Sequence, residues 1–412
     1  MNIDSERLRE RFDKIKLISS TDVGYTRFSY SSEDKQVREY LLNIMSGLGM
    51  EITIDCVGNI RAKYNPKGLE GPSVMAGSHI DTVKNGGLYD GLLGVLSTLE
   101  CIQTIQENSI ELGSPLELII FAEEEGSNFD VTMIGSKVIT GKISLEELKE
   151  LRASDGCSAL EVIKAAGYLD NPCRIIEKGQ VKAMVEYHIE QGGVLEVKNK
   201  RIGVVQAIAG MKTIEVIITG VSNHAGTTPM NLRRDPLVAA SYVIHQLSEI
   251  PRSKNLGTAV VTVGKINANP NGSNVIAQGV RFNVDIRDVT EEGIKEIENS
   301  LNGLVQCAME KYDVEGKLIE LGKSEIVRLS SDVANVIENI AIKRNMDYMR
   351  INSGAVHDCA MLTGITEIGM IFVPSIKGIS HSPYENTDFK DIIEGANLLL
   401  ETLVSLGSLT IV

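Results

Sequence analysis

The sequence predicts an α/β fold in which a mixed, mostly parallel sheet is flanked by helices and carries an inserted α+β domain. Three observations support this prediction. Helical and strand-like segments alternate along the first half of the chain, and residues 116–122 (LELIIFA) form an apolar run typical of strands buried in parallel sheets. From about residue 210 the pattern changes to alternating strands, and the earlier pattern returns after residue 325.

Length and composition indicate a globular protein with more than one domain. A chain of 412 residues is too long for one comfortable core, so two domains are expected. No apolar run reaches the length of a membrane span, and the charged first residues do not resemble a signal peptide. The net charge of -14 argues against nucleic acid or an anionic membrane as a partner.

The cysteines predict a reduced protein. They show neither CxxC pairing nor the spacing of a small disulfide scaffold, so we expect reduced, mostly buried thiols in a cytoplasmic protein. The six positions are Cys56, Cys101, Cys157, Cys173, Cys307 and Cys359.

Most segments of the first half can be assigned from periodicity and from glycines at their ends. Helices are expected at residues 4–19, 34–47 and 91–108. Strands are expected at residues 51–55, 59–63, 73–77, 116–122 and 183–188. Functional groups in open α/β sheets lie at the carboxyl ends of strands, so the residues that follow these strands are candidates for a site.

The second half contains the predicted insert. Strands are expected at residues 211–220, 258–268 and 280–289, and helices at residues 236–247 and 290–311. This β-α-β-β-α order predicts a compact antiparallel α+β insert over residues 210–325, which we expect to act as a lid. A helix at 331–344, a strand at 369–372 and a helix at 391–406 resume the first pattern. The first domain is therefore expected to be discontinuous, with residues 1–209 and 326–412.

One stretch, GSHIDTVKNGGLYDG, combines a histidine and two aspartates between glycines. His79 and Asp81 are one residue apart, which places both side chains on one face of an extended strand end. Asp90 precedes a helix, where a carboxylate can act as an N-cap. Alternatively, His79 and Asp90 are metal ligands and Asp81 holds the imidazole.

Three adjacent glutamates, Glu123, Glu124 and Glu125, follow the apolar strand at 116–122. One interpretation is a solvated turn. The other is a buried cluster, in which a bound metal supplies the compensating charge and one carboxylate acts as general base on a metal-bound water. The strand before them favours the second interpretation.

Two further histidines could complete a ligand set. His188 lies in EYHIEQGG and His381 in GISHSPYENTD. With His79, Asp90 and one glutamate they provide mixed nitrogen and oxygen ligands, which suit zinc and also manganese, cobalt or nickel. The spacing does not decide between one ion and two.

The insert carries polar residues of its own. His224 lies in the loop NHAGTTP and could stabilise an oxyanion. Asn274 and Arg287 could bind a substrate carboxylate together. For Arg287, an ion pair with Asp285 or Asp288 is an equally good interpretation.

Seven segments together resemble the hydantoinase/carbamoylase family of dinuclear metal amidases, which is related to aminoacylase-like and carboxypeptidase-like zinc hydrolases. The resemblance covers nearly the whole chain. The segments are GSHIDTVKNGGLYDG, AEEEGSNF, HIEQGGVLE, NHAGTTPMNLRRD, DIR, SGAVHD and PSIKGISHSPYENTD.

The resemblance implies a role for each candidate residue. Glu124 matches the general base, Asp81 the residue that orients His79, and His224 a residue that stabilises the oxyanion. The residues that match metal ligands are His79, Asp90, Glu125, His188 and His381, with Asp90 bridging two divalent ions. The residues that match substrate-binding positions are Gln191, His224, Asn274, Arg287, Gly354 and His357. The choice among the three glutamates depends on the register of the family motif.

The implied function is hydrolysis of the carbamoyl group of allantoate or of an N-carbamoyl-L-amino acid, with release of ammonia and carbon dioxide. Two alternatives are an aminoacylase or dipeptidase with the same dinuclear site, and a metal-binding protein without catalysis. The resemblance also implies a homodimer formed through the insert.

Overall fold

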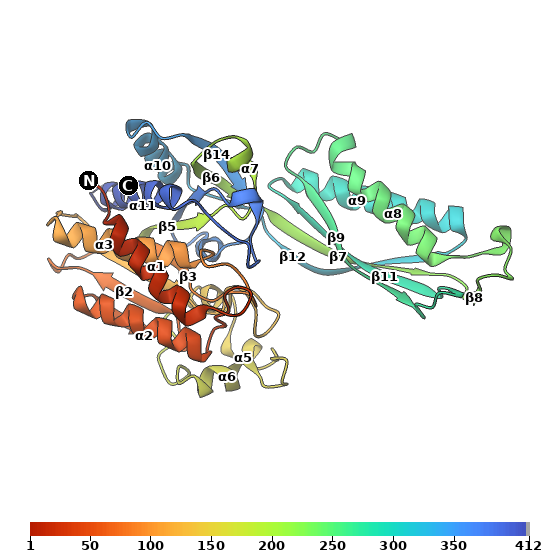
Figure 1. The fold of residues 1–412 in the computed structure, drawn as a ribbon, viewed down its shortest axis with the longest axis horizontal. Helices are drawn as coiled ribbons and strands as arrows, with labels where there is room; N and C mark the ends of the chain where they lie inside the picture. The colour runs from red at the N-terminus through yellow and green to blue at the C-terminus, as the bar shows by residue number, and fades with distance from the viewer. Residues whose placement is uncertain (409–412) are drawn as a thin grey trace. The chain divides into compact units, whose positions relative to one another are not determined.

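The computed structural model describes residues 1–408 and divides into two compact units (Figure 1). Unit 1 comprises Met1–Gln206 and the chain from Leu329 to Ser408, and unit 2 comprises Ala207–Arg328. The predicted insert, residues 210–325, lies inside unit 2.

A nine-stranded mixed sheet, most of whose residues belong to unit 1, forms the centre of that unit. Its strands are β1 (Glu51–Ile54), β2 (Ile60–Tyr64), β3 (Ser73–His79), β4 (Leu116–Phe121), β5 (Val181–Ile189), β6 (Ile202–Ile208), β13 (Val327–Arg328), β14 (Tyr348–Ser353) and β15 (Glu367–Val373). They run in the order β1-β2-β4-β3-β5-β15-β6-β13, and β14 pairs with β6. Strands β4, β3, β5 and β15 are parallel, whereas β1 and β2 on one side and β6 and β13 on the other pair antiparallel.

Unit 1 contains several helices of different lengths. They are α1 (Ser5–Ser19), α2 (Ser32–Gly47), α3 (Leu92–Glu107), α4 (Ile134–Ile139), α5 (Leu145–Leu148), α6 (Ala159–Ala165), α7 (Val194–Val197), α10 (Ser331–Lys343) and α11 (Phe389–Ser408), with short 3-10 turns η2 (Asp358–Leu362) and η3 (Ile376–Gly378). Helices α3 and α11 pack against β3 and β5, and α1, α2 and α10 contribute to the same apolar core. Among residues 1–408, no helix is long and apolar enough to cross a bilayer.

The predicted α/β class is confirmed, and most predicted elements are present within a few residues. Helix α1 begins where expected because the Asp4 carboxylate caps it by accepting the backbone N–H groups of Glu6 and Arg7. The sequence patterns missed β6, β14 and the short helices α4 to α6. Helices of four to seven residues complete too few turns to show a helical period.

Two cysteines contradict the expectation of six reduced thiols, because Cys56 and Cys173 form a disulfide. They are 117 residues apart, so no local spacing marks the pair. Cys56 lies between β1 and β2 and packs in a small apolar cluster with Ile134 and Leu148. The disulfide therefore ties this turn to the segment that precedes β5. Of the other cysteines in residues 1–408, Cys101 and Cys359 are buried and Cys157 and Cys307 are exposed.

Unit 2 is a four-stranded antiparallel sheet with two long helices packed on it. Its elements are β7 (Gly210–Thr219), β8 (Asn223–His224), η1 (Met230–Leu232), α8 (Pro236–Ser253), β9 (Val260–Asn269), β10 (Val275–Ile276), β11 (Gly279–Asp288), α9 (Glu291–Tyr312) and β12 (Glu315–Ser324). The sheet order is β12-β7-β11-β9. The predicted β-α-β-β-α order is present, and β12, which the sequence patterns missed, adds one edge strand.

Candidate metal centre

Polar side chains gather at the carboxyl ends of the parallel strands of unit 1. His79 is the last residue of β3, and His188 is the last but one residue of β5. Glu124 and Glu125 follow β4, and Asp90 precedes α3. Adjacent parallel strands end at the same edge of a sheet, so residues far apart in the sequence meet there. The loop before α11 adds His381 to the group.

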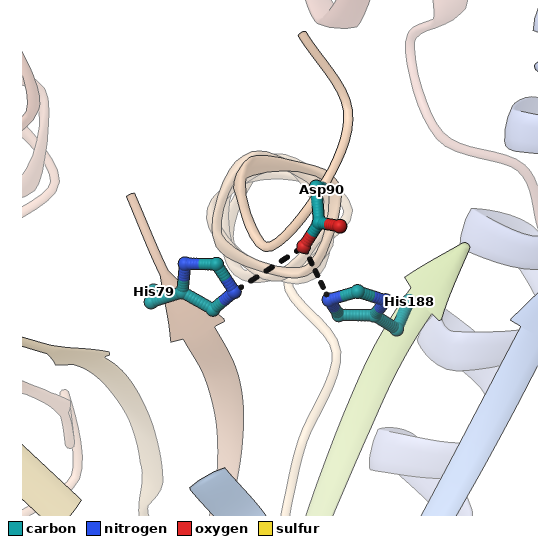
Figure 2. Close-up of side chains that lie close together, drawn as sticks. All are labelled: His79, Asp90 and His188. Atoms are coloured by element: carbon teal, nitrogen blue, oxygen red, sulfur yellow. Dashed lines mark ion pairs between the residues drawn. The ribbon is translucent and has the colours of Figure 1, made fainter. Parts of the chain in front are cut away.

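The carboxylate of Asp90 lies at the centre of three imidazoles. Its Oδ1 is 3.5 Å from Nε2 of His79 and 3.2 Å from Nε2 of His188, as Figure 2 shows. Its Oδ2 is 3.5 Å from Nε2 of His381. Each oxygen of Asp90 therefore faces a different set of histidines.

The interpretation of Asp90 as a helix cap is wrong. Gly91 occupies the N-cap position of α3, and no side chain caps that helix. Gly91 has a φ of 63°, and a Cβ at this position would lie 2.4 Å from the ring of His79. Only glycine can therefore turn the chain here while the imidazole packs against it. The turn directs the Asp90 carboxylate toward the histidines (Figure 2).

Backbone carbonyls fix the orientation of two of the imidazoles. Nδ1 of His79 is 3.1 Å from the carbonyl oxygen of Asp81, and Nδ1 of His188 is 2.9 Å from that of Ile189. A neutral histidine in this arrangement carries its proton on Nδ1, so its Nε2 holds a lone pair, and Nε2 of His188 accepts the backbone N–H of Gly91 at 3.1 Å. Both rings thus present the tautomer and the nitrogen that a metal ion would bind.

Two groups of potential metal ligands share Asp90. His79, Asp90 and His188 offer one group of ligand atoms within 4.8 Å of one another, and Asp90, Glu125 and His381 offer a second. Nitrogen and oxygen donors of this kind suit zinc, manganese, cobalt and nickel. Oε1 of Gln191 is buried beside them and has no hydrogen-bond partner within residues 1–408. A buried polar atom without a partner is costly, which favours a further polar ligand at this point.

The electrostatics of the cluster also fit a site that binds positive charge. Burial raises the pKa of Glu124 well above its usual range, and His79 offsets this only in part. Burial, Asp90 and Glu124 raise the pKa of Glu125 in the same way. Although burial acts in the opposite direction, the three imidazoles hold the pKa of Asp90 well below its usual range. Divalent ions would supply the positive charge that favours the ionised form of these glutamates.

The structure separates the three adjacent glutamates. Both oxygens of Glu123 accept hydrogen bonds from Asn128, at 2.9 Å from the backbone N–H and 2.6 Å from the side-chain amide. Glu124 and Glu125 instead form a group of ligand atoms with His79. Glu123 and Glu124 are buried, so the solvated-turn interpretation is wrong.

The carboxylate of Asp81 lies closer to the backbone of the glutamates than to the ring of His79. Its two carboxylate oxygens accept the backbone N–H groups of Glu124 at 3.2 Å and Glu125 at 3.0 Å. The nearest carboxylate oxygen is 3.6 Å from Nδ1 of His79, whereas the Asp81 carbonyl oxygen is closer. The side chain of Asp81 therefore positions the two glutamates, and its backbone orients His79.

Replacing Asp81 with asparagine is expected to weaken the binding of divalent ions about 10- to 100-fold, a typical effect of losing a group that supports metal ligands. The asparagine NH2 would face a backbone N–H that now donates to an oxygen, leaving that N–H without an acceptor. Titration calorimetry of metal-free protein with Mn²⁺ measures the change. The exposed Asp130, in the loop that follows β4, provides the control, because Asp130→Asn should bind ions like the unaltered protein.

Two of the predicted substrate-binding residues of unit 1 contact the centre. Nε2 of Gln191 donates to Oδ2 of Asp90 at 2.7 Å. His357 is buried, packs edge-on against His188 with ring centroids 4.7 Å apart, and has Nε2 2.9 Å from Oγ of Ser353. Gly354 is exposed in the same loop. His357 thus lies behind a predicted ligand, and Gly354 lies at the surface.

Unit 2 brings two of its three predicted residues together. Val275, the neighbour of Asn274, pairs with His224, and the Asn274 carbonyl accepts the N–H of Ala225 at 3.0 Å. Strand β11 begins at Gly279, shortly after Asn274 in the sequence. Arg287 lies near the other end of this strand, eight residues or about 26 Å from Gly279. Its Nε donates to Asp285 at 2.9 Å, so the predicted ion pair with Asp285 is present.

Sequence reasoning missed two residues that touch Asp90. The Ser380 hydroxyl lies 2.9 Å from Oδ2 of Asp90, and Glu385 accepts the Asp90 backbone N–H at 3.2 Å. Both flank His381 in the segment SHSPYE. Their closeness in sequence to a candidate metal ligand could have identified this hydroxyl group and this carboxyl group as site residues.

The chain is similar to known proteins over almost its whole length. The family model described as Peptidase family M20/M25/M40 matches residues 75–405. An N-carbamoyl-L-amino-acid amidohydrolase of Pseudomonas sp. (strain NS671) is 36% identical over 409 residues, which cover 98% of this chain and 99% of the relative. An allantoate amidohydrolase of Escherichia coli (strain K12) is 35% identical over 391 residues, 93% of each chain. A crystal structure of a hydantoinase/carbamoylase family amidase from Burkholderia multivorans has a TM-score of 0.93 and 31% identity, covering 100% of this chain and 99% of that one.

Proposed function

The chain belongs to Peptidase family M20/M25/M40, among the hydantoinase/carbamoylase amidases, and we propose that it hydrolyses the ureido group of allantoate or of N-carbamoyl-L-amino acids. It is a metal-dependent hydrolase of carbon–nitrogen bonds other than peptide bonds. The observation that supports the ureido assignment best is the group of His79, Asp90 and His188 beside Glu124 and Glu125, in a chain whose relatives act on ureido acids.

In the proposed reaction, water adds to the ureido carbonyl and the bond from that carbon to the substituted nitrogen breaks. The released carbamate decomposes to ammonia and carbon dioxide. Two divalent ions (zinc, manganese, cobalt or nickel) held by His79, Asp90, Glu125, His188 and His381 would polarise the carbonyl and make the attacking water more acidic. Glu124 takes the proton of that water and delivers it to the leaving nitrogen.

Further roles belong to residues of unit 2. Nδ1 of His224 accepts the backbone N–H groups of Gly226 at 3.0 Å and Thr227 at 3.2 Å. Its proton is therefore on Nε2, which can donate a hydrogen bond to the developing oxyanion. We assign Arg287 and Asn274 to the binding of the substrate. About 26 Å of strand separates Arg287 from the end of β11 near Asn274 and His224. One small substrate can therefore contact both ends only if they belong to different copies of the chain.

The ammonia released from a panel of substrates tests the proposal. Dialysed protein is supplied with Mn²⁺, Zn²⁺, Co²⁺ or Ni²⁺ and assayed with allantoate, N-carbamoyl-L-amino acids, dipeptides and N-acetyl amino acids. Turnover of a ureido acid with at least one ion supports the proposal. Turnover of dipeptides or N-acetyl amino acids alone would favour the aminoacylase alternative, and bound metal without any turnover would favour a metal-binding protein.

We propose that the chain forms a homodimer through unit 2. Strand β9 is an edge of its sheet, and the exposed side chains of Val260 and Ile266 lie on that edge strand. An edge strand with exposed apolar side chains favours pairing with another chain, and two copies of the same strand can pair around a twofold axis.

Light scattering across a range of concentrations is expected to show a dimer that the double substitution Val260→Lys/Ile266→Lys converts to monomer. Four lysines facing one another would oppose the pairing of the two strands. Ile342→Lys is the control, because Ile342 is equally exposed but lies on α10 of unit 1. A protein that is monomeric at every concentration contradicts the proposal.

A cytoplasmic location and the absence of nucleic-acid or membrane partners stay predictions from composition and charge. The Cys56–Cys173 disulfide bears on the first of these, because stable disulfides are rare in the cytoplasm.

A further inference from the structure

Glu385 connects two segments of the metal centre that are nearly 300 residues apart. Its Oε1 accepts the backbone N–H groups of Tyr89 at 3.0 Å and Asp90 at 3.2 Å. Its Oε2 is 3.0 Å from the hydroxyl of Ser380, the residue before His381. The side chain is buried, with 7% of the residue exposed, so these hydrogen bonds do not compete with bulk water. One carboxyl group thus holds the backbone of Asp90 and the loop of His381.

Ser380 extends this connection to the side chain of Asp90. Its Oγ lies 2.9 Å from Oδ2 of Asp90 and 3.0 Å from Oε2 of Glu385. Oδ1 of Asp90 faces His79 and His188, which the strands β3 and β5 hold in place. Oδ2 of Asp90 faces Gln191, Ser380 and His381, which all lie in loops. Glu385 therefore holds together the part of the centre whose residues come from loops.

Gly87 provides an independent sign that the carboxyl group must occupy this place. A Cβ on Gly87 would lie 2.0 Å from both Cδ and Oε1 of Glu385. Two non-bonded atoms cannot approach so closely, so any side chain at position 87 would push the carboxyl group away from Tyr89 and Asp90. Glycine at this position leaves the space that Glu385 needs.

We propose that Glu385 is a positioning residue, which fixes Asp90 relative to the His381 loop and so sets the affinity of the ion bound by Asp90, Glu125 and His381. The inference extends the two-ion centre of the proposed function to a residue that binds no ion itself. Groups that support metal ligands in this way typically change ion affinity about 10- to 100-fold when removed.

Calorimetric titration of the metal-free full-length protein with Mn²⁺ tests the inference. Glu385→Ala is expected to lower the affinity for one of the two ions at least about tenfold and to leave the affinity for the other nearly unchanged. His381→Ala should have the same effect. Glu385→Gln should restore binding, because its amide oxygen can accept both N–H groups and its NH2 can donate to Ser380. A general loss of folding would lower the affinity for both ions, and it would do so equally in Glu385→Ala and Glu385→Gln.

Gly87→Ala tests the inference without replacing Glu385. It should reproduce the loss seen in Glu385→Ala, and the double variant should lose no more than either single one, because the added methyl group then meets no carboxyl group. If Glu385→Ala fails to fold, Gly87→Ala and Ser380→Ala decide by the same titration. Unchanged binding of both ions in these variants, or failure of Glu385→Gln to restore binding, overturns the inference. The proposed function fails separately, when no ureido acid is hydrolysed by protein that binds both ions.

Discussion

Glu124→Gln is expected to lower kcat for the ureido substrate by about 10²- to 10⁴-fold, the usual contribution of a general base or acid. Glutamine has nearly the shape of glutamate but cannot take a proton from water or give one to the leaving nitrogen. Glu124 lies in a buried group with His79 and Glu125, where no other described residue has been assigned that task. Steady-state kinetics measures the loss, and metal analysis of the same sample shows whether both ions are still bound.

Glu123→Gln is the matched control for this experiment. Glu123 is also buried and adjacent in sequence, but its oxygens bind Asn128 and not the centre. Its turnover should stay within a few fold of the unaltered protein. Near-full turnover of Glu124→Gln in metal-replete protein would show that another group is the base, and equal losses in both variants would point to a disturbed loop.

Asp90→Asn is expected to have the second large effect, with ion affinity reduced by at least about 100-fold and activity lost with it. Removal of a side chain that only supports metal ligands typically lowers ion affinity about 10- to 100-fold. Replacing the residue that both groups of candidate ligands share should lower it at least as much. Asparagine keeps one carbonyl oxygen but places an uncharged NH2 where the second oxygen faces His381 or His79. Metal analysis after gel filtration, together with the ammonia assay, measures both effects.

A surface aspartate provides the comparison for Asp90→Asn. Asp332 is exposed in the first turn of α10, and Asp332→Asn should retain both ions and full activity. If Asp90→Asn binds two ions with unaltered affinity, Asp90 does not bridge them. Excess Mn²⁺ should restore part of the activity of Asp90→Asn if weak binding is the only defect.

Local sequence patterns predicted the elements and the chemistry of the centre. The caps, apolar runs and glycines that mark α1, β4 and α9 depend on residues a few positions apart, so they can be read without the fold. The placement of His79, Glu124 and His188 at strand ends followed from the same patterns. Their meeting at one edge followed from the rule that parallel strands end together.

Contacts between residues distant in sequence were decided by the tertiary structure alone. The Cys56–Cys173 disulfide, the position of Glu385 on Asp90, and the binding of Glu123 to Asn128 depend on which side chains face each other in the folded chain. The sequence by itself determined which residues could bind divalent ions. Only the folded chain determined that Asp90 turns away from its helix toward three histidines, because packing of Gly91 against His79 sets that direction.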